Sequence, residues 1–123
     1  CANEAKARGW EQKLILACLL HDASEAYIAD IIRPVKPYLT NYLEIEDQIM
    51  SVIWQHFQLE LTPEEHKKWK QIDDEILDSE LKEMFSGEAE RIPVPLRSTP
   101  DFSERPHGEV KEEFIRIAEE LLN

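Results

Sequence analysis

The segment Leu14-Ile15-Leu16-Ala17-Cys18-Leu19-Leu20-His21-Asp22 contains the most apolar run of the chain. Its first seven residues are apolar on every side of a helix, which is typical of a central, buried helix. Two polar residues then end the apolar run abruptly. We expect one long helix over about 11–30, in which His21 and Glu25 are four residues apart and share a face.

The remaining chain also predicts helices. Apolar residues recur with helical periodicity nearly throughout, and the 123 residues include only three glycines. We expect further helices over about 2–8, 41–57, 62–85 and 108–122. The fold class is therefore all-α, a helical bundle forming a single domain over 1–123.

Two segments of the chain carry specific local signals. Thr62-Pro63-Glu64-Glu65 predicts a helix start, with threonine as the N-cap, proline in the first turn and acids near the positive helix end. We expect the helix that follows to bend or break near its middle. Residues 86–106 contain Pro93, Pro95, Pro100 and Pro106. They predict a loop too long for a plain connector, and hence a lid or a partner surface.

Charge and composition exclude several classes of function. The net charge of −12 argues against binding of a DNA or RNA duplex, which needs clustered lysine and arginine. No apolar run reaches the roughly 20 residues of a membrane span, and no signal peptide is visible. The two cysteines, Cys1 and Cys18, match neither a zinc motif nor a disulfide framework. We expect a cytoplasmic protein in which Cys18 is a buried, reduced thiol.

The opening residues, Cys1-Ala2-Asn3-Glu4-Ala5-Lys6-Ala7, have the character of the middle of a helix. They include neither a cap nor a lead-in. We expect an N-terminal helical portion of the protein to precede Cys1.

The polar residues after Leu20 are candidates for chemistry. A carboxylate brought to a buried position needs a cation, a metal ion or hydrogen bonds. His21 and Asp22 offer nitrogen and oxygen ligands suited to a divalent ion such as Mn, Fe, Co, Ni or Zn, and Glu25 and Asp30 follow closely. A further ligand could come from Asp73, which follows the apolar Ile72 within a predicted helix.

The stretch from Leu19 to Asp30 resembles the core motif of HD-domain phosphohydrolases, most closely the bacterial and phage branch related to 5′-deoxynucleotidases. Arg33-Pro34-Val35-Lys36 resembles the Pro-x-Lys element of that branch. Lys70-Gln71-Ile72-Asp73, with Glu80 seven residues on, resembles its later Lys-x-x-Asp pattern. The resemblance covers roughly residues 1 to 85 and implies an HD-domain helical bundle.

The resemblance also implies one divalent metal ion (Mn, Co, Fe, Ni, Zn or Mg) held by two histidines and two aspartates. Three of these ligands correspond to His21, Asp22 and Asp73. The fourth, a histidine on an earlier helix, has no counterpart before His21, and we expect it upstream of Cys1. The chain also departs from the family at Ala29, where glycine is usual.

The resemblance implies roles for the neighbouring residues as well. Glu25 corresponds to the catalytic glutamate that moves protons as a general acid or base, and Asp30 to a second acid that assists it. Arg33 and Lys36 are candidates for holding phosphate oxygens. Simpler readings remain open: Glu25 as a helical partner of His21, Asp30 as a helix-end residue, and the two cations as ordinary loop charges.

These expectations point to hydrolysis of a small phosphorylated nucleotide, first a nucleoside 5′-monophosphate. One alternative is pyrophosphohydrolysis of a nucleoside triphosphate or a ppGpp-like alarmone, for which the site would look the same. Another is a non-catalytic helical binding module with a degenerate site. Members of this branch are often dimers, so a homodimer is an expected assembly, with apolar faces such as that of 108–122 available for it.

Overall fold

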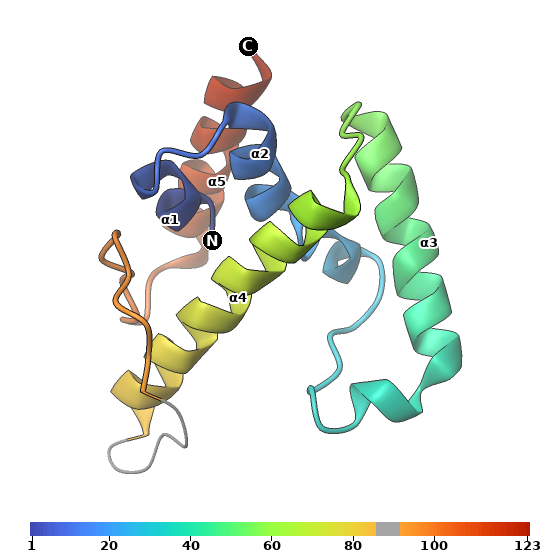
Figure 1. Cartoon of the computed structure of the whole chain (residues 1–123), viewed down its shortest axis with the longest axis horizontal. Coiled ribbons are helices and arrows are strands. Elements are labelled where there is room, and N and C mark those ends of the chain that lie inside the picture. Colours follow the sequence, from blue (N-terminus) through green and yellow to red (C-terminus); the bar gives the residue numbers. More distant parts are fainter. Residues whose placement is uncertain (86–91) are drawn as a thin grey trace. The chain divides into compact units, whose positions relative to one another are not determined.

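The computed structural model describes residues 1–85 and 92–123, and these are helices and irregular segments without a strand (Figure 1). The all-α prediction is confirmed. The α-helices are α1 (Ala2–Ala7), α2 (Gln12–Leu20), α3 (Thr40–His56), α4 (Pro63–Met84) and α5 (His107–Leu122). Two short 3₁₀ helices, η1 (Ala23–Ala26) and η2 (Lys36–Tyr38), lie between α2 and α3. Within the described ranges, none of the helices is long and apolar enough to cross a membrane.

The chain forms two compact units. The first comprises Cys1–Leu19 and Thr62–Asn123, and thus holds α1, α4, α5 and nearly all of α2. The second comprises Leu20–Leu61, with η1, η2 and α3.

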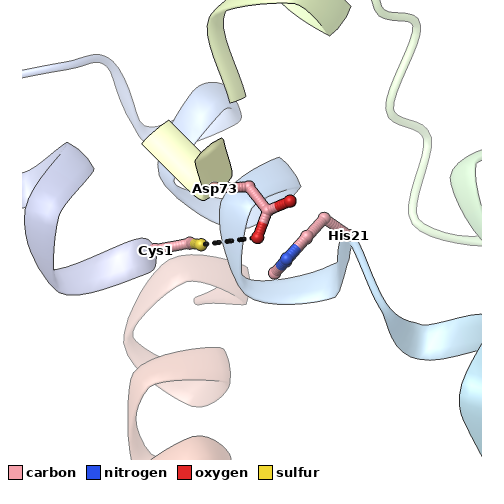
Figure 2. Close-up of side chains that lie close together, drawn as sticks. All are labelled: Cys1, His21 and Asp73. Atoms are coloured by element: carbon pink, nitrogen blue, oxygen red, sulfur yellow. Dashed lines mark hydrogen bonds between the residues drawn. The ribbon is translucent and has the colours of Figure 1, made fainter. Parts of the chain in front are cut away.

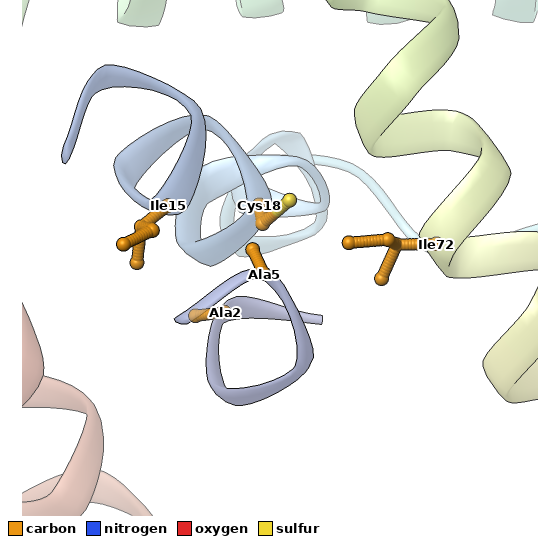
Figure 3. Packing of buried hydrophobic residues seen from close by; sticks show 5 residues of the cluster. All are labelled: Ala2, Ala5, Ile15, Cys18 and Ile72. Carbon is orange, nitrogen blue, oxygen red and sulfur yellow. The ribbon is translucent and has the colours of Figure 1, made fainter. Parts of the chain in front are cut away.

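The core of the first unit forms where α1, α2 and α4 meet. Ile72 of α4 is fully buried and packs with Ala2 and Ala5 of α1 and with Ile15 and Cys18 of α2 (Figure 3). Because the two alanines are small, α1 can approach α4 closely at this point. The prediction that Cys18 is a buried thiol is confirmed, and neither Cys1 nor Cys18 forms a disulfide in the described part of the chain.

Helix α4 begins as the sequence predicts. The Thr62 hydroxyl accepts a hydrogen bond from the Glu65 backbone N–H, and the Glu65 carboxylate accepts one from the Thr62 backbone N–H. This capping box satisfies two N–H groups that would otherwise lack a helical partner. The predicted break is wrong, because α4 continues for 22 residues.

The proline-rich segment is irregular over its described part, residues 92–106, as predicted for a loop. The rest of the predicted loop, 86–91, lies outside the described residues. Helix α5 then packs on the N-terminal helices: Asn3 and Lys6 of α1 contact Glu113 and Glu120 of α5. The proline-rich segment thus connects two helices of the same unit.

In the second unit, α3 packs against both 3₁₀ helices. The Tyr42 hydroxyl of α3 donates a 2.6 Å hydrogen bond to the Ala29 carbonyl oxygen, in the segment between η1 and η2. This contact fixes the segment that carries Asp30 and Arg33.

Candidate functional site

The first candidate ligands, His21 and Asp22, lie in a turn directly after α2. The His21 side chain is 12% exposed and that of Asp22 is 62% exposed. Their ligand atoms, His21 Nε2 and Asp22 Oδ2, are 2.9 Å apart. The His21 side chain is therefore mostly buried, whereas the Asp22 side chain is largely exposed to solvent.

The predicted helix over 11–30 is wrong in its second half, because α2 ends at Leu20 and Glu25 lies in η1. The Glu25 backbone N–H donates to the Asp22 carbonyl oxygen at 3.0 Å, the tighter spacing of a 3₁₀ helix. Aspartate and serine side chains offer the backbone local alternatives to the α-helix, and the segment around η1 contains both. His21 and Glu25 consequently do not share a helix face.

The 2.9 Å contact between His21 Nε2 and Asp22 Oδ2 has the length of an ion pair or a hydrogen bond, and it is also close to the spacing of two ligands on one divalent cation. Two ligand atoms about 2.1 Å from an ion and at right angles to each other are about 3 Å apart. The 2.9 Å between Nε2 and Oδ2 agrees with this value. An imidazole nitrogen beside a carboxylate oxygen is also a donor set that transition metals and zinc accept.

Glu25 has an environment that favours its protonated form. Glu25 is an exposed residue, but the loss of water around its carboxyl group is the main cause that raises its pKa, and the nearby carboxylates of Asp22 and Asp30 raise it further. Lys36 and His21 lower the pKa of Glu25 by smaller amounts. Carboxyl groups with a raised pKa are suited to proton transfer near neutral pH.

The predicted phosphate-binding residues have different surroundings. Arg33 is exposed in the connector before η2. Lys36 is half-buried, and its Nζ lies 2.6 Å from Glu46 Oε1 and 5.5 Å from the centre of the Tyr42 ring. Burial lowers the pKa of Lys36, but the hydrogen bond and charge of Glu46 outweigh it, so the pKa is raised and the ammonium group stays charged.

The third candidate ligand, Asp73, is half-buried on α4 in the first unit. Its Oδ1 accepts a hydrogen bond from the Cys1 thiol, with 4.0 Å between sulfur and oxygen (Figure 2). Cys1 is the N-cap of α1, so this contact joins the start of α1 to the middle of α4. No sequence pattern links these two residues, which are 72 positions apart.

The candidate ligands are divided between the two units. His21 and Asp22 belong to the second, and Asp73 belongs to the first. Cys1, His21 and Asp73 each offer one atom of a type that binds metal ions: a sulfur, an imidazole nitrogen and a carboxylate oxygen. The chemistry of these donors fits a transition metal or zinc.

Sequence reasoning did not single out Glu4 or Arg8. Their spacing of four residues is the one signal that could have indicated an ion pair, and the structure places Arg8 Nε 2.7 Å from Glu4 Oε1.

Comparison of the chain with models of known families, with curated proteins and with solved structures finds no match.

Proposed function

We propose that this chain is a divalent-metal-dependent phosphohydrolase of the HD type, acting on a small phosphorylated nucleotide, first a nucleoside 5′-monophosphate. The observation that carries the proposal is the sequence block from His21 to Asp30. In that block an adjacent ligand pair, 2.9 Å apart, is followed by a carboxyl group whose pKa is raised.

In this proposal one metal ion is held by His21, Asp22 and Asp73, with a further ligand from another part of the protein. The proposal requires His21 and Asp22 to meet Asp73 on a single ion. When bound, such an ion lowers the pKa of a water molecule and polarises a phosphoryl oxygen. The Cys1–Asp73 hydrogen bond supports the proposal by orienting one carboxylate oxygen before an ion is bound.

Glu25 is the proposed proton carrier. A water molecule attacks phosphorus and gives up one proton to solvent, the bond between phosphorus and the ester oxygen breaks, and the departing ester oxygen takes up a proton to leave as a hydroxyl group. Partial loss of water and the charges of Asp22 and Asp30 raise the pKa of Glu25, which suits this carboxyl group to supply that proton as a general acid. Asp30 assists by its charge, which raises the pKa of Glu25, and the carbonyl oxygen of its neighbour Ala29 accepts the Tyr42 hydrogen bond.

The substrate phosphate needs local cations, because the chain has a net charge of −12. Arg33 is exposed and offers a forked contact to two phosphate oxygens. Lys36 is already paired with Glu46, so its contribution is a fixed positive charge beside the substrate rather than a mobile clamp.

A metal and phosphate-release assay on the full-length protein tests the proposal. Metal content is measured, and inorganic phosphate is assayed with nucleoside 5′-monophosphates and with triphosphates, each with Mn²⁺ and with a chelator. We expect stoichiometric metal and chelator-sensitive release of phosphate from a monophosphate. Pyrophosphate release from triphosphates alone would instead indicate a pyrophosphohydrolase. Stoichiometric metal without any turnover would indicate a binding module.

A further inference from the structure

A buried carboxylate, Glu4, organises the first unit. Glu4 is only 1% exposed. The carboxylate accepts hydrogen bonds from Arg8 Nε at 2.7 Å, from the Arg97 backbone N–H at 2.9 Å and from the Ser98 backbone N–H at 2.7 Å. The Ser98 hydroxyl donates to it as well. An anion buried without such donors would strongly destabilise the fold, so these hydrogen bonds together stabilise the buried Glu4 carboxylate.

Two consecutive backbone N–H groups on Glu4 attach the proline-rich segment to α1. Arg97 and Ser98 lie in the described part of that segment, more than 90 positions from Glu4 in the chain. Because Glu4 is buried, this attachment is part of the packed interior of the unit. The contact argues against a freely moving lid over residues 97–98.

Arg8 extends the network from Glu4 to α4. Its second guanidinium nitrogen lies 2.5 Å from Glu75 Oε2, and the other Glu75 oxygen accepts a 2.7 Å hydrogen bond from Gln71. The side chains of Arg8 and Glu75 are only 15% and 13% exposed. A guanidinium group has a planar array of donors, so it can bridge two carboxylates in fixed directions.

Helix α1 is therefore held against α4 at both of its ends. At its N-terminal end Cys1 contacts Asp73, and at its C-terminal end Arg8 contacts Glu75. Between these contacts Ala2 and Ala5 pack with Ile72. Ile72 and Glu75, which lie on either side of Asp73 in α4, are thus both in contact with α1.

We infer that Glu4 and Arg8 are positioning residues for the metal ligand Asp73. They fix the position of α1 on α4. Because Cys1 at the start of α1 contacts Asp73, this position also holds the Asp73 carboxylate in the orientation that an ion needs. The inference rests on the proposed function, because it assigns the network a purpose at that metal site. Ligand orientation by outer contacts commonly changes metal affinity by about 10- to 100-fold.

Mn²⁺ affinity of the full-length protein, measured by calorimetry on folded samples, tests the inference. We expect Arg8→Gln to raise the Kd for Mn²⁺ about tenfold or more. Arg8→Lys, which keeps the charge but loses the fork, should recover part of the affinity. Glu75→Gln leaves the Arg8–Glu4 pair in place and should also raise Kd, which keeps the inference testable if Arg8→Gln does not fold.

The matched control is Lys67→Gln, which breaks a 3.0 Å ion pair with Glu64 within α4 and involves no residue of α1. It should leave Kd unchanged, whatever it does to stability. Folded Arg8→Gln or Glu75→Gln with the wild-type Kd would overturn the inference and leave the proposed function standing. A wild-type protein that binds no Mn²⁺ would overturn both.

Discussion

His21 Nε2 and Asp22 Oδ2 lie 2.9 Å apart although the two residues are neighbours in the sequence. Adjacent side chains on a continuous helix point in different directions and do not meet in this way. They meet here because α2 ends at Leu20 and the next two residues form a turn. The end of the buried helix thus creates the candidate ligand pair.

The first prediction concerns the exposed member of this pair. Asp22→Asn removes a negative charge but keeps the side-chain shape, so we expect the Kd for Mn²⁺ to rise at least about tenfold. Because the Asp22 side chain is 62% exposed, the free energy of unfolding without metal should change by only about 0.5 kcal/mol. Calorimetric titration and urea unfolding measure the two quantities. An unchanged Kd would remove Asp22 from the ligand set.

The second prediction concerns Glu25, which is proposed to move a proton and not to bind metal. Glu25→Gln should lower kcat by about 10²- to 10⁴-fold, the usual contribution of general acid–base catalysis, and leave the Kd for Mn²⁺ near the wild-type value. Single-turnover phosphate release and metal titration of the same sample measure both. A parallel loss of metal affinity would mean that Glu25 acts as a ligand instead.

The third prediction separates two roles of Lys36. If its charge helps to hold substrate phosphate, Lys36→Met should raise KM about tenfold or more, as expected for loss of a charge-assisted contact. Glu46→Gln weakens the 2.6 Å Lys36–Glu46 pair and leaves the ammonium group free for phosphate, so KM should stay the same or fall. Steady-state kinetics on both variants measure this. Equal increases in KM for both variants would show that the pair serves only the fold.

The fourth prediction concerns the pH dependence of stability. Burial raises the pKa of Glu4, but hydrogen bonds from Arg97, Ser98 and Arg8 outweigh it and hold the pKa at about 2, below the ordinary 4.5. A carboxyl group with a lowered pKa in the folded state stabilises the fold above pH 4.5, and this stability is lost as the pH falls toward 2. About 2 kcal/mol of the Glu4 contribution should be gone by pH 3.

Urea unfolding of the wild-type protein and of Glu4→Gln, from pH 7 to pH 3, isolates this contribution. Other carboxylates, including Glu65 with its pKa of about 2, titrate in both proteins, and so only the difference between them reports on Glu4. We expect the difference in unfolding free energy to shrink as the pH falls below 4.5. A difference that is constant across the range would contradict the account of Glu4.

Local signals predicted much of the fold. The capping residues Thr62 and Glu65 fixed the start of α4, and Gly9, whose φ is +72°, follows the end of α1 as expected of a glycine stop. These features act over a few residues, so they can be seen in the sequence. The end of α2 could not be predicted, since the first proline or glycine after Leu20 is Pro34.

The candidate site was predictable only in part, for the same physical reason. His21, Asp22 and Glu25 lie together because they are close in the chain. The Cys1–Asp73 contact joins residues 72 positions apart, and the Glu4–Ser98 contact joins residues 94 positions apart. In the sequence Glu4 has the pattern of an exposed helical acid, because its burial depends on contacts with the distant proline-rich segment.

The proposed function requires Asp73 to bind a metal ion. A Mn²⁺ titration and a phosphate-release assay on full-length Asp73→Ala, with Asp78→Ala on the same helix as the control, measure whether it does. We expect Asp73→Ala to lose both stoichiometric metal binding and turnover, whereas Asp78→Ala keeps both. Retained metal and retained phosphate release in Asp73→Ala would contradict the proposed function.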